Sequence, residues 1–298
     1  MADRRIAKRI LPPVRPEFVL APAADGSVAV GEIARPLSLW ERLSNRTAFR
    51  RTATRLPLIV AWELYARHID NPLLLPTFSD TAIAFYDSIV NGNLLSRTLV
   101  SIRVLLMGYV IGVALAAMIT IIAVTTRFGT DLLSTLTAMF NPLPAIALLP
   151  LALLWFGLGI PSMLFVIVHS VLWVVALNAH SGFLGVSETL RMAGQNYGLH
   201  GLRYVMLILI PAAFPAILTG LKIGWAFAWR TLIAAELVFG VAAGQGGLGW
   251  FIFEYRNQLE VAYVFAGLTM VIIIGLLVES VIFRNIELIT VRRWGMQR

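Results

Sequence analysis

The chain has 298 residues, of which 58% are hydrophobic and 13% are charged, and its mean hydropathy is +0.80. A soluble domain carries about 25% charged residues, so this composition indicates a membrane protein. The absence of cysteine excludes disulfides, thiol catalysis and cysteine metal sites. No nucleic-acid-reading motif accompanies the net charge of +8, so no nucleic-acid partner is expected.

Residues 1–55 are polar, basic and interrupted by prolines, and they hold eleven of the 24 lysines and arginines. They lack the compact apolar core of a signal peptide. We interpret them as a basic cytoplasmic tail. Within it, residues 37–51 combine apolar residues at helical spacing with arginines, which predicts an interfacial helix. At the other end, residues 294–298 are interpreted as a short C-terminal tail.

A transmembrane domain is predicted over residues 56–293, because six of its segments are apolar enough to cross a membrane, which takes about 20 apolar residues. The segments are residues 56–68, 97–125, 132–156, 162–179, 204–235 and 261–283. The first is short, and the fifth is so long that we expect it to bend or break. The second holds Gly108, Gly112 and Ala116 at four-residue spacing, which favours close helix packing within one chain or between copies.

The basic residues set the expected orientation. Besides the basic N-terminal tail, four arginines lie at the C-terminal end: Arg284, Arg292, Arg293 and Arg298. Since basic residues stay on the cytoplasmic side, both termini are expected there, which requires an even number of spans. Six spans then place Arg127 and residues 187–203 in the cytoplasm. We interpret the chain as a multi-pass protein of the bacterial inner membrane.

Prolines interrupt the third predicted span. Pro142, Pro144 and Pro150 each remove a backbone donor and kink a helix. Because lipid leaves such backbone groups unsatisfied, a break of this kind faces protein or a water-filled cavity. Pro144 and Pro150 are therefore candidates for the wall of a translocation path.

Charges inside the fifth predicted span also indicate a path, since charge at bilayer depth is costly and usually functional. Arg230 and Glu236 flank the sequence TLIAA, and Trp229 precedes the arginine. In one interpretation Arg230 lines the substrate path, Trp229 walls a pocket and Glu236 is a gate carboxylate. In the other, Arg230 and Glu236 form a structural ion pair that holds a broken helix.

A glycine-containing loop is the longest polar interruption in the second half of the chain. It resembles the EAA loop, the coupling-helix signature of the membrane subunits of ABC importers. Ala193, Gly198 and Pro211 fall in register with that signature, while the family's glutamate position is Met192 here and its second alanine position is Gly194. By this resemblance, six residues are expected to couple the chain to an ATPase: Met192, Ala193, Gly194, Gly198, Leu199 and Leu202.

Two further stretches resemble the nitrate/sulfonate/taurine branch of these permeases: NPLPAIALLPLALLWFG at residues 141–157, and WRTLIAAEL followed by GLGWFI within residues 229–252. The resemblance covers roughly residues 56–293. It implies an all-α membrane protein with six transmembrane helices of the type I ABC importer permease kind and a cytoplasmic coupling helix. It also implies a non-enzymatic permease subunit that forms the translocation path for a small, anionic solute.

The partners implied by the resemblance are a second permease copy, two cytoplasmic ATPase subunits, an extracytoplasmic binding protein and the lipid bilayer. The chain has no G-x-x-x-x-G-K-[ST] motif, so it cannot bind ATP by a P-loop. ATP and Mg are expected on the partner ATPase, and no cofactor and no metal is expected in this chain.

Two alternatives remain at this point. A secondary transporter would need internal inverted repeats, and none is visible. A membrane-embedded enzyme would need catalytic residues or a metal cluster, but His169 and His180 lie eleven residues apart, roughly 16 Å along a helix, and cannot share one metal. The stretch GQGGLG at residues 244–249 matches a dinucleotide fingerprint without the strand it requires, and we expect it to be an extracytoplasmic turn.

Overall fold

The computed structural model describes residues 47–239 and 246–293, which are helical with short connections and, within these ranges, contain no strand. The predicted tail up to residue 46, most of the interfacial helix and the C-terminal tail lie outside the described residues. The chain from Pro57 onward forms one compact unit.

The helices follow one another with few long connections. They are α2 (Thr47–Ile69), α3 (Phe78–Val90), α4 (Leu94–Thr125), α5 (Arg127–Phe140), the 3₁₀ turn η1 (Ala145–Leu148), α6 (Leu149–Phe156), α7 (Ile160–Leu184), α8 (Glu188–Asn196), α9 (Gly201–Tyr204), the π-helical η2 (Val205–Leu209), α10 (Ile210–Phe239), α11 (Leu248–Asn257), α12 (Val261–Leu277), the π-helical η3 (Val278–Phe283), α13 (Arg284–Glu287) and the π-helical η4 (Leu288–Arg292).

Four of these helical runs are long and apolar enough to cross a membrane: Leu94–Thr125, Ile160–Leu184, Val205–Val238 and Val261–Arg292. The pair α5 and η1–α6 would make a fifth if it is one bent span. The prediction of an all-α, multi-pass membrane protein is therefore confirmed. The count of six is not, because α2, which contains the first predicted span, bears several arginines and is not among the candidates.

The third predicted span, residues 132–156, is not one helix. It is divided into Arg127–Phe140 and Ala145–Phe156, whose axes differ by 85°. Pro142 and Pro144 lie in the break, and Pro150 lies in the first turn of α6, where its missing N–H leaves no helical bond unmade. The prolines thus divide the segment into two separate helices, where the sequence predicted one kinked helix.

The break predicted in the fifth span is wrong. Arg230 and Glu236 lie in one continuous helix of 30 residues, Ile210–Phe239, because TLIAA contains neither glycine nor proline. The irregularity lies earlier, at the π-helical residues 205–209, next to Pro211. π-Helical turns of this kind often occur near functional positions.

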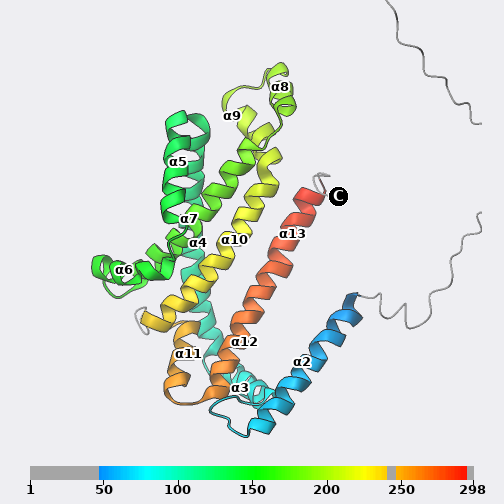
Figure 1. The fold of residues 1–298 in the computed structure, drawn as a ribbon, viewed down its shortest axis with the longest axis vertical. Helices are drawn as coiled ribbons and strands as arrows, with labels where there is room; N and C mark the ends of the chain where they lie inside the picture. The colour runs from blue at the N-terminus through cyan, green and yellow to red at the C-terminus, as the bar shows by residue number, and fades with distance from the viewer. Residues whose placement is uncertain (1–46, 240–245, 294–298) are drawn as a thin grey trace, which may run out of the picture. The chain divides into compact units, whose positions relative to one another are not determined.

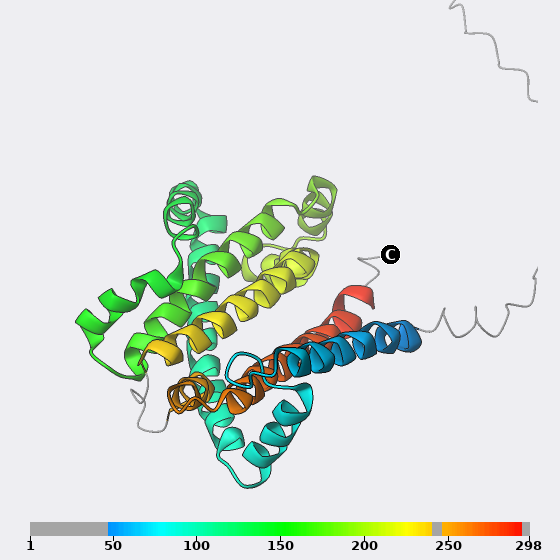
Figure 2. The ribbon, with the colours of Figure 1, turned by 60° about the horizontal axis from the view of Figure 1, so that its bottom comes forward.

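Helix α7 is the centre of the packing. It runs beside α10, and both cross α4 (Figure 1; Figure 2). A Cβ atom added to Gly108 would lie 2.6 Å from the Ile167 side chain, and one added to Gly112 would lie 2.8 Å from Val171. The small-residue spacing predicted from the sequence therefore packs α4 against α7 within the chain.

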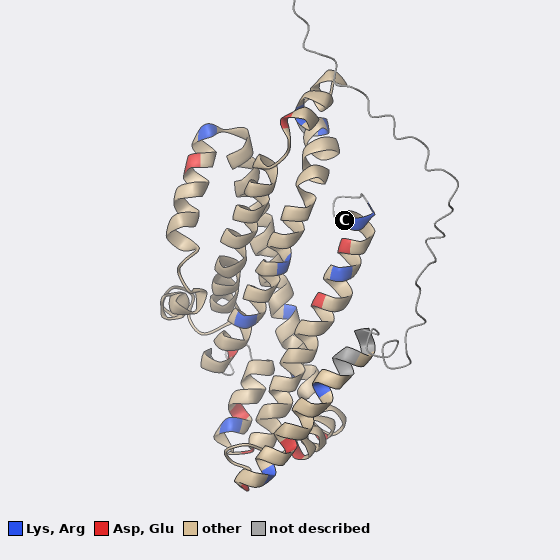
Figure 3. Cartoon of the chain, turned by 45° about the vertical axis from the view of Figure 1, so that its right-hand side comes forward, with Lys and Arg blue, Asp and Glu red and all other residues tan. Residues whose placement is uncertain are grey.

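The helices from α3 onward have two distinct ends. Helices α8 and α9 lie where α7 ends and α10 begins, whereas α3 and α11 lie at the opposite end (Figure 1). Charged residues gather toward these ends, and few lie between them (Figure 3). This distribution is typical of helices whose middle portions cross hydrocarbon.

Candidate functional site

The predicted coupling segment forms a short helix, α8, that is capped at both ends. The Ser187 hydroxyl accepts a hydrogen bond from the Leu190 amide at 3.4 Å. At the other end, Leu199 N donates to the Gly194 carbonyl at 3.1 Å, and Gly198 has a φ of +71°. Because a side chain strains this left-handed backbone conformation, a glycine is favoured at this helix end.

One face of α8 is fixed to the membrane helices. Gly194 is buried, and a Cβ atom there would lie 2.8 Å from the Tyr204 ring. Arg191 donates from Nη2 to the Phe183 carbonyl at 2.7 Å and from Nε to the Val186 carbonyl at 3.2 Å, which satisfies backbone groups near the end of α7. A displacement of α8 would therefore act directly on the end of α7 and on η2.

The exposed side chains of α8 are partly apolar. Met192 is 50% exposed and Leu190 also faces outward, while Tyr197, just past the helix, is 86% exposed. Of the other predicted coupling residues, Ala193 and Leu199 are half-buried. Leu202 lies in α9, and its side chain is outside the described part of the structure. The five predicted residues whose side chains are described therefore differ in exposure: Met192 and Gly198 are exposed, whereas Gly194 is buried.

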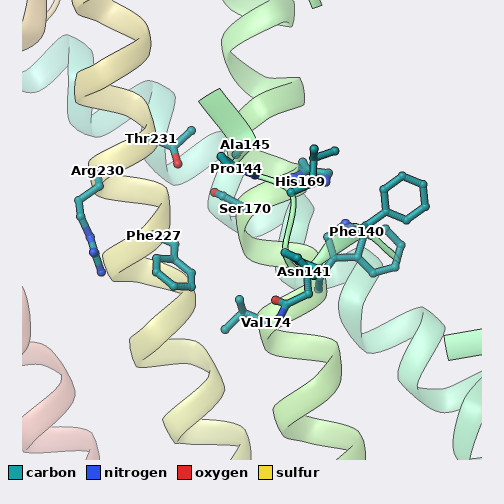
Figure 4. A pocket seen from close by; sticks show the side chains of 13 residues that line it. Phe140, Asn141, Pro144, Ala145, His169, Ser170, Val174, Phe227, Arg230 and Thr231 are labelled. Carbon is teal, nitrogen blue, oxygen red and sulfur yellow. The ribbon is translucent and has the colours of Figure 1, made fainter. Parts of the chain in front are cut away.

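A cavity of about 220 Å³ opens at the α5–η1 break (Figure 4). It is lined by Phe140, Asn141, Pro142, Leu143, Pro144, Ala145, His169, Ser170, Trp173, Val174, Phe227, Arg230 and Thr231. Of the predicted path residues, Pro144 and Arg230 line it, whereas Pro150, Trp229 and Glu236 do not. The break and two long spans, α7 and α10, thus enclose this space.

Arg230 lies at the edge of this cavity, beside Phe227 (Figure 4). Its Nε donates to the Ala226 carbonyl at 3.1 Å, and its guanidinium carbon is 5.0 Å from the centre of the Phe227 ring. Within the described residues, no carboxylate lies within 4.0 Å of it. Its charge is thus met by a carbonyl and a ring face only.

Arg230 also lines a second cavity, of about 530 Å³, between α10 and α12. Trp229 belongs to this cavity, and its indole N–H has no partner among the described residues. Lys222 lines the same cavity but is paired with Glu287. Arg230 is therefore placed between two spaces that open on different sides of α10.

Glu236 lines neither of these cavities and does not pair with Arg230, so the predicted structural ion pair is wrong, while its role as a gate stays a prediction. Its carboxylate is 2% exposed and lies 2.7 and 2.8 Å from the Ser101 hydroxyl, which donates to it. Gly249 N donates to it at 2.7 Å, and Leu248 N donates to the Ser101 hydroxyl at 2.7 Å. Glu236 thus joins α4, α10 and the start of α11 through neutral donors.

The glycine stretch predicted as an extracytoplasmic turn is part of this network. Its described residues, 246–249, are buried, and residues 244 and 245 lie outside the description. A Cβ atom on Gly249 would lie 2.6 Å from that of Glu236, and Gly247 also leaves no room for one beside the carboxylate. These two glycines allow the backbone to approach a buried acid, which differs from a dinucleotide site.

Sequence reasoning missed the aromatic side of the first cavity. His169 was interpreted as a packed or interfacial histidine that cannot share a metal with His180, and Trp173 was not considered. The two residues lie one helical turn apart on α7 and therefore share a face. Phe140 stacks on Trp173 with ring centres 5.2 Å apart. The available signal was this i, i+4 spacing opposite a proline-rich break.

No group of three or more His, Asp or Glu residues in the described ranges could hold a metal ion. Several apolar spans around a broken helix, with a cavity at the break, define a multi-pass helical membrane protein suited to moving a small solute. Residues 108–287 match the family described as the binding-protein-dependent transport system inner membrane component, and the chain belongs to this family.

Similar proteins agree with this assignment. An ABC transporter permease protein of Methanocaldococcus jannaschii is 32% identical over 225 residues, covering 74% of this chain and 83% of that protein. The taurine transport system permease protein TauC of Escherichia coli is 34% identical over 148 residues, which are 50% of this chain and 52% of TauC. The nitrate import permease protein NrtB of Synechocystis is 32% identical over 173 residues, covering 58% and 60% of the two chains.

The resemblance to ABC importer permeases and to their nitrate/sulfonate/taurine branch is therefore confirmed. The chain is a non-catalytic permease subunit of an ABC importer. This result favours the permease over the secondary transporter and over the membrane-embedded enzyme.

Proposed function

We propose that two copies of this chain form the translocation path of a type I importer, each with six spans. Two cytoplasmic ATPases bind the copies through α8, and an extracytoplasmic binding protein delivers the solute. ATP and Mg bind to the ATPases. The chain lies in the bacterial inner membrane with both termini in the cytoplasm. The family, whose description includes a binding protein, supports this composition.

The observation that supports coupling through α8 is that this helix combines exposed apolar side chains with buried anchors. Leu190 and Met192 face outward, as an interface core requires, while Gly194 and Arg191 hold the helix to α7 and η2. The helices α7 and α10 that continue from these anchors also line the cavity at the break. Movement of an attached ATPase would thus reach the walls of the path through two continuous helices.

A small anion is the solute class that the cavity favours. Arg230 lines it, and among the residues that the structure describes no Asp or Glu does. A cation without a countercharge compensates part of the desolvation of an anion at this depth. The names of the relatives, which refer to taurine and nitrate, point to the same class for this chain.

The coupling role is tested by purifying the chain with candidate ATPase and binding-protein subunits from its own genome. The double substitution Leu190→Asp with Met192→Asp is expected to reduce ATPase co-purification about tenfold, because buried interface anchors dominate binding energy. Gln195→Asp, also exposed on α8, is the matched control and should retain the ATPase. Undiminished co-purification of the double variant would contradict docking at α8.

The transport role is tested in proteoliposomes containing the complete complex. ATP-dependent uptake of labelled taurine or nitrate is expected in the presence of the binding protein, with none when ATP is replaced by ADP. Uptake that proceeds without ATP, or failure to take up any anion in a panel of sulfonates and nitrate, would contradict the proposal.

A further inference from the structure

The cavity at the α5–η1 break contains hydrogen-bonding groups that nothing in the described structure satisfies. Trp173 is 8% exposed, and its indole Nε1 has no hydrogen-bond partner. Both ring nitrogens of His169 are also buried without a partner. Buried polar groups are nearly always paired, so three such atoms on two neighbouring side chains of one cavity call for an explanation.

The unpartnered groups are held rigidly rather than left over from loose packing. Phe140 stacks on Trp173 with an interplanar angle of 12°, and its ring meets His169 edge-on with centroids 6.2 Å apart. The Ser170 hydroxyl, in contrast, is already used, since it donates to the Ile167 carbonyl at 2.7 Å. The aromatic contacts thus position two side chains that line the cavity, while their unpartnered nitrogens are themselves buried.

The charge and the size of the cavity restrict what could pair with these donors. No carboxylate lines it, Arg230 lies at its edge, and the indole nitrogen can only donate. A volume of about 220 Å³ is smaller than the roughly 300–1,000 Å³ of sites for drug-sized ligands. A small solute rich in acceptor oxygens fits these limits.

We propose that this cavity is a transit site for a small oxyanion such as a sulfonate or nitrate, which accepts hydrogen bonds from Trp173 and His169 while Arg230 offsets its charge. The proposal rests on the proposed function and locates one binding site of the translocation path at this cavity. The Trp173 indole is a neutral donor, and Arg230, the cation among the described lining residues, lies at the edge, so the site holds an anion without trapping it, as passage requires.

The absence of cysteine allows a direct test in the complete complex in proteoliposomes. Ser170→Cys places one thiol on the cavity wall, and Ser134→Cys places one in a neighbouring cavity between α5 and α7 as the matched control. The rate of modification by methyl methanethiosulfonate is measured with and without methanesulfonate. Methanesulfonamide serves as the uncharged analogue of nearly the same shape.

Methanesulfonate is expected to slow modification of Ser170→Cys about tenfold at a concentration about ten times its dissociation constant. It should not protect Ser134→Cys, and methanesulfonamide should protect neither. Equal protection by the sulfonamide, or equal protection of both positions, would overturn the oxyanion site. If Ser170→Cys does not accumulate, Asn141→Cys is used in the same way, since Asn141 also lines the cavity.

The donors are tested by removing the indole N–H while keeping an aromatic ring. Trp173→Phe in the Ser170→Cys background should raise the dissociation constant of methanesulfonate about tenfold, the loss typical of a hydrogen bond to a charged group, so protection at the same concentration falls from about tenfold to about twofold. Trp225→Phe is the control, because its indole N–H also lacks a described partner but lines only the other cavity. Equal protection in both variants would exclude Trp173 as a ligand.

The outcome separates this inference from the proposed function. A complex that takes up taurine or nitrate with ATP, but shows no protection of Ser170→Cys by methanesulfonate or by nitrate, would overturn the transit site and leave the importer intact. A complex without ATP-dependent anion uptake, in which the anions still protect the thiol, would contradict the proposed substrate and support an anion site.

Discussion

Glu236 accepts its hydrogen bonds from Ser101 and from Gly249, and no cation lies within 4.0 Å of it among the described residues. The sequence indicated that a buried acid in a span needs an explanation. It did not indicate the partners, because Ser101 is 135 residues away and Gly249, 13 residues away, lies in the next helix, α11. The free-energy cost of burying a carboxylate can thus be recognised from the sequence, whereas the hydrogen-bond donors that offset this cost depend on the tertiary fold.

The role of Glu236 as a structural acceptor predicts graded effects of substitution. Glu236→Ala leaves the Gly249 amide and the Ser101 hydroxyl buried without their acceptor, at a cost of about 1–3 kcal/mol for each group. Glu236→Gln retains an acceptor oxygen and should cost less. Thermal unfolding in detergent measures both variants. Glu260→Ala, an exposed acid at the start of α12, is the control and should change stability by less than about 0.5 kcal/mol.

The same network excludes the ion pair considered from the sequence. Arg230 and Glu236 make no contact, so the effects of Arg230→Gln and Glu236→Gln on stability should add within about 0.5 kcal/mol. Restoration of accumulation in the double variant would contradict this assignment and return the pair to consideration.

At the scale of elements, apolar run length predicted four long spans well, and the prolines correctly marked the third segment as irregular. The 85° bend was not predictable, because a proline shows where a helix ends but not the direction in which the chain continues. The break expected in α10 failed for a related reason. The length of the fifth predicted span was interpreted as evidence of a break near Arg230. The structure instead has π-helical residues at the start of this span, at 205–209.

The contact of α4 with α7 gives a prediction about two elements. Gly112→Ala places a methyl group 2.8 Å from the Val171 Cβ and should destabilise the protein by about 1–3 kcal/mol. Adding Val171→Gly removes both the Cβ at 2.8 Å and the Cγ1 at 3.0 Å, so the double variant should be more stable than the sum of the single effects by about 0.5–3 kcal/mol. Unfolding midpoints and m-values of the four proteins measure this coupling.

The control for this pair is Gly275→Ala in α12. A Cβ atom there would meet only the Trp229 indole nitrogen at 3.8 Å, an ordinary contact. This change should be neutral or stabilising by up to about 1 kcal/mol, because alanine favours a helix over glycine. A Gly112→Ala variant as stable as Gly275→Ala would show that α4 and α7 are not packed as described.

At the scale of the whole molecule, the resemblance to the EAA loop located the segment that forms α8 and the glycine that follows it. Which residues of this segment are exposed and which are buried came from the structure. Gly194 was predicted to couple and is buried against Tyr204, since the face a short helix turns inward depends on the helices beneath it. The cavity donors His169 and Trp173 were missed, because a histidine and a tryptophan at helical spacing are typical of an ordinary core.

Orientation across the membrane gives the last prediction. The α8 end of the described helices bears Arg127 and Arg203, which lack a carboxylate within 4.0 Å among the described residues. At the α11 end Arg97 is paired with Glu254 at 2.9 Å, whereas Arg256 has no such partner among the described residues. Unpaired basic residues favour the cytoplasm, so the α8 end should lie there and the α11 end outside.

Single cysteines at exposed positions of the cysteine-free chain test this orientation. In intact cells an impermeant thiol reagent should label Asn257→Cys, at the end of α11, and not His200→Cys, just after α8. Permeabilised cells should show labelling of both, which controls for thiol reactivity. Labelling of His200→Cys in intact cells would place α8 outside, where no ATPase could reach it, and would contradict coupling through that helix.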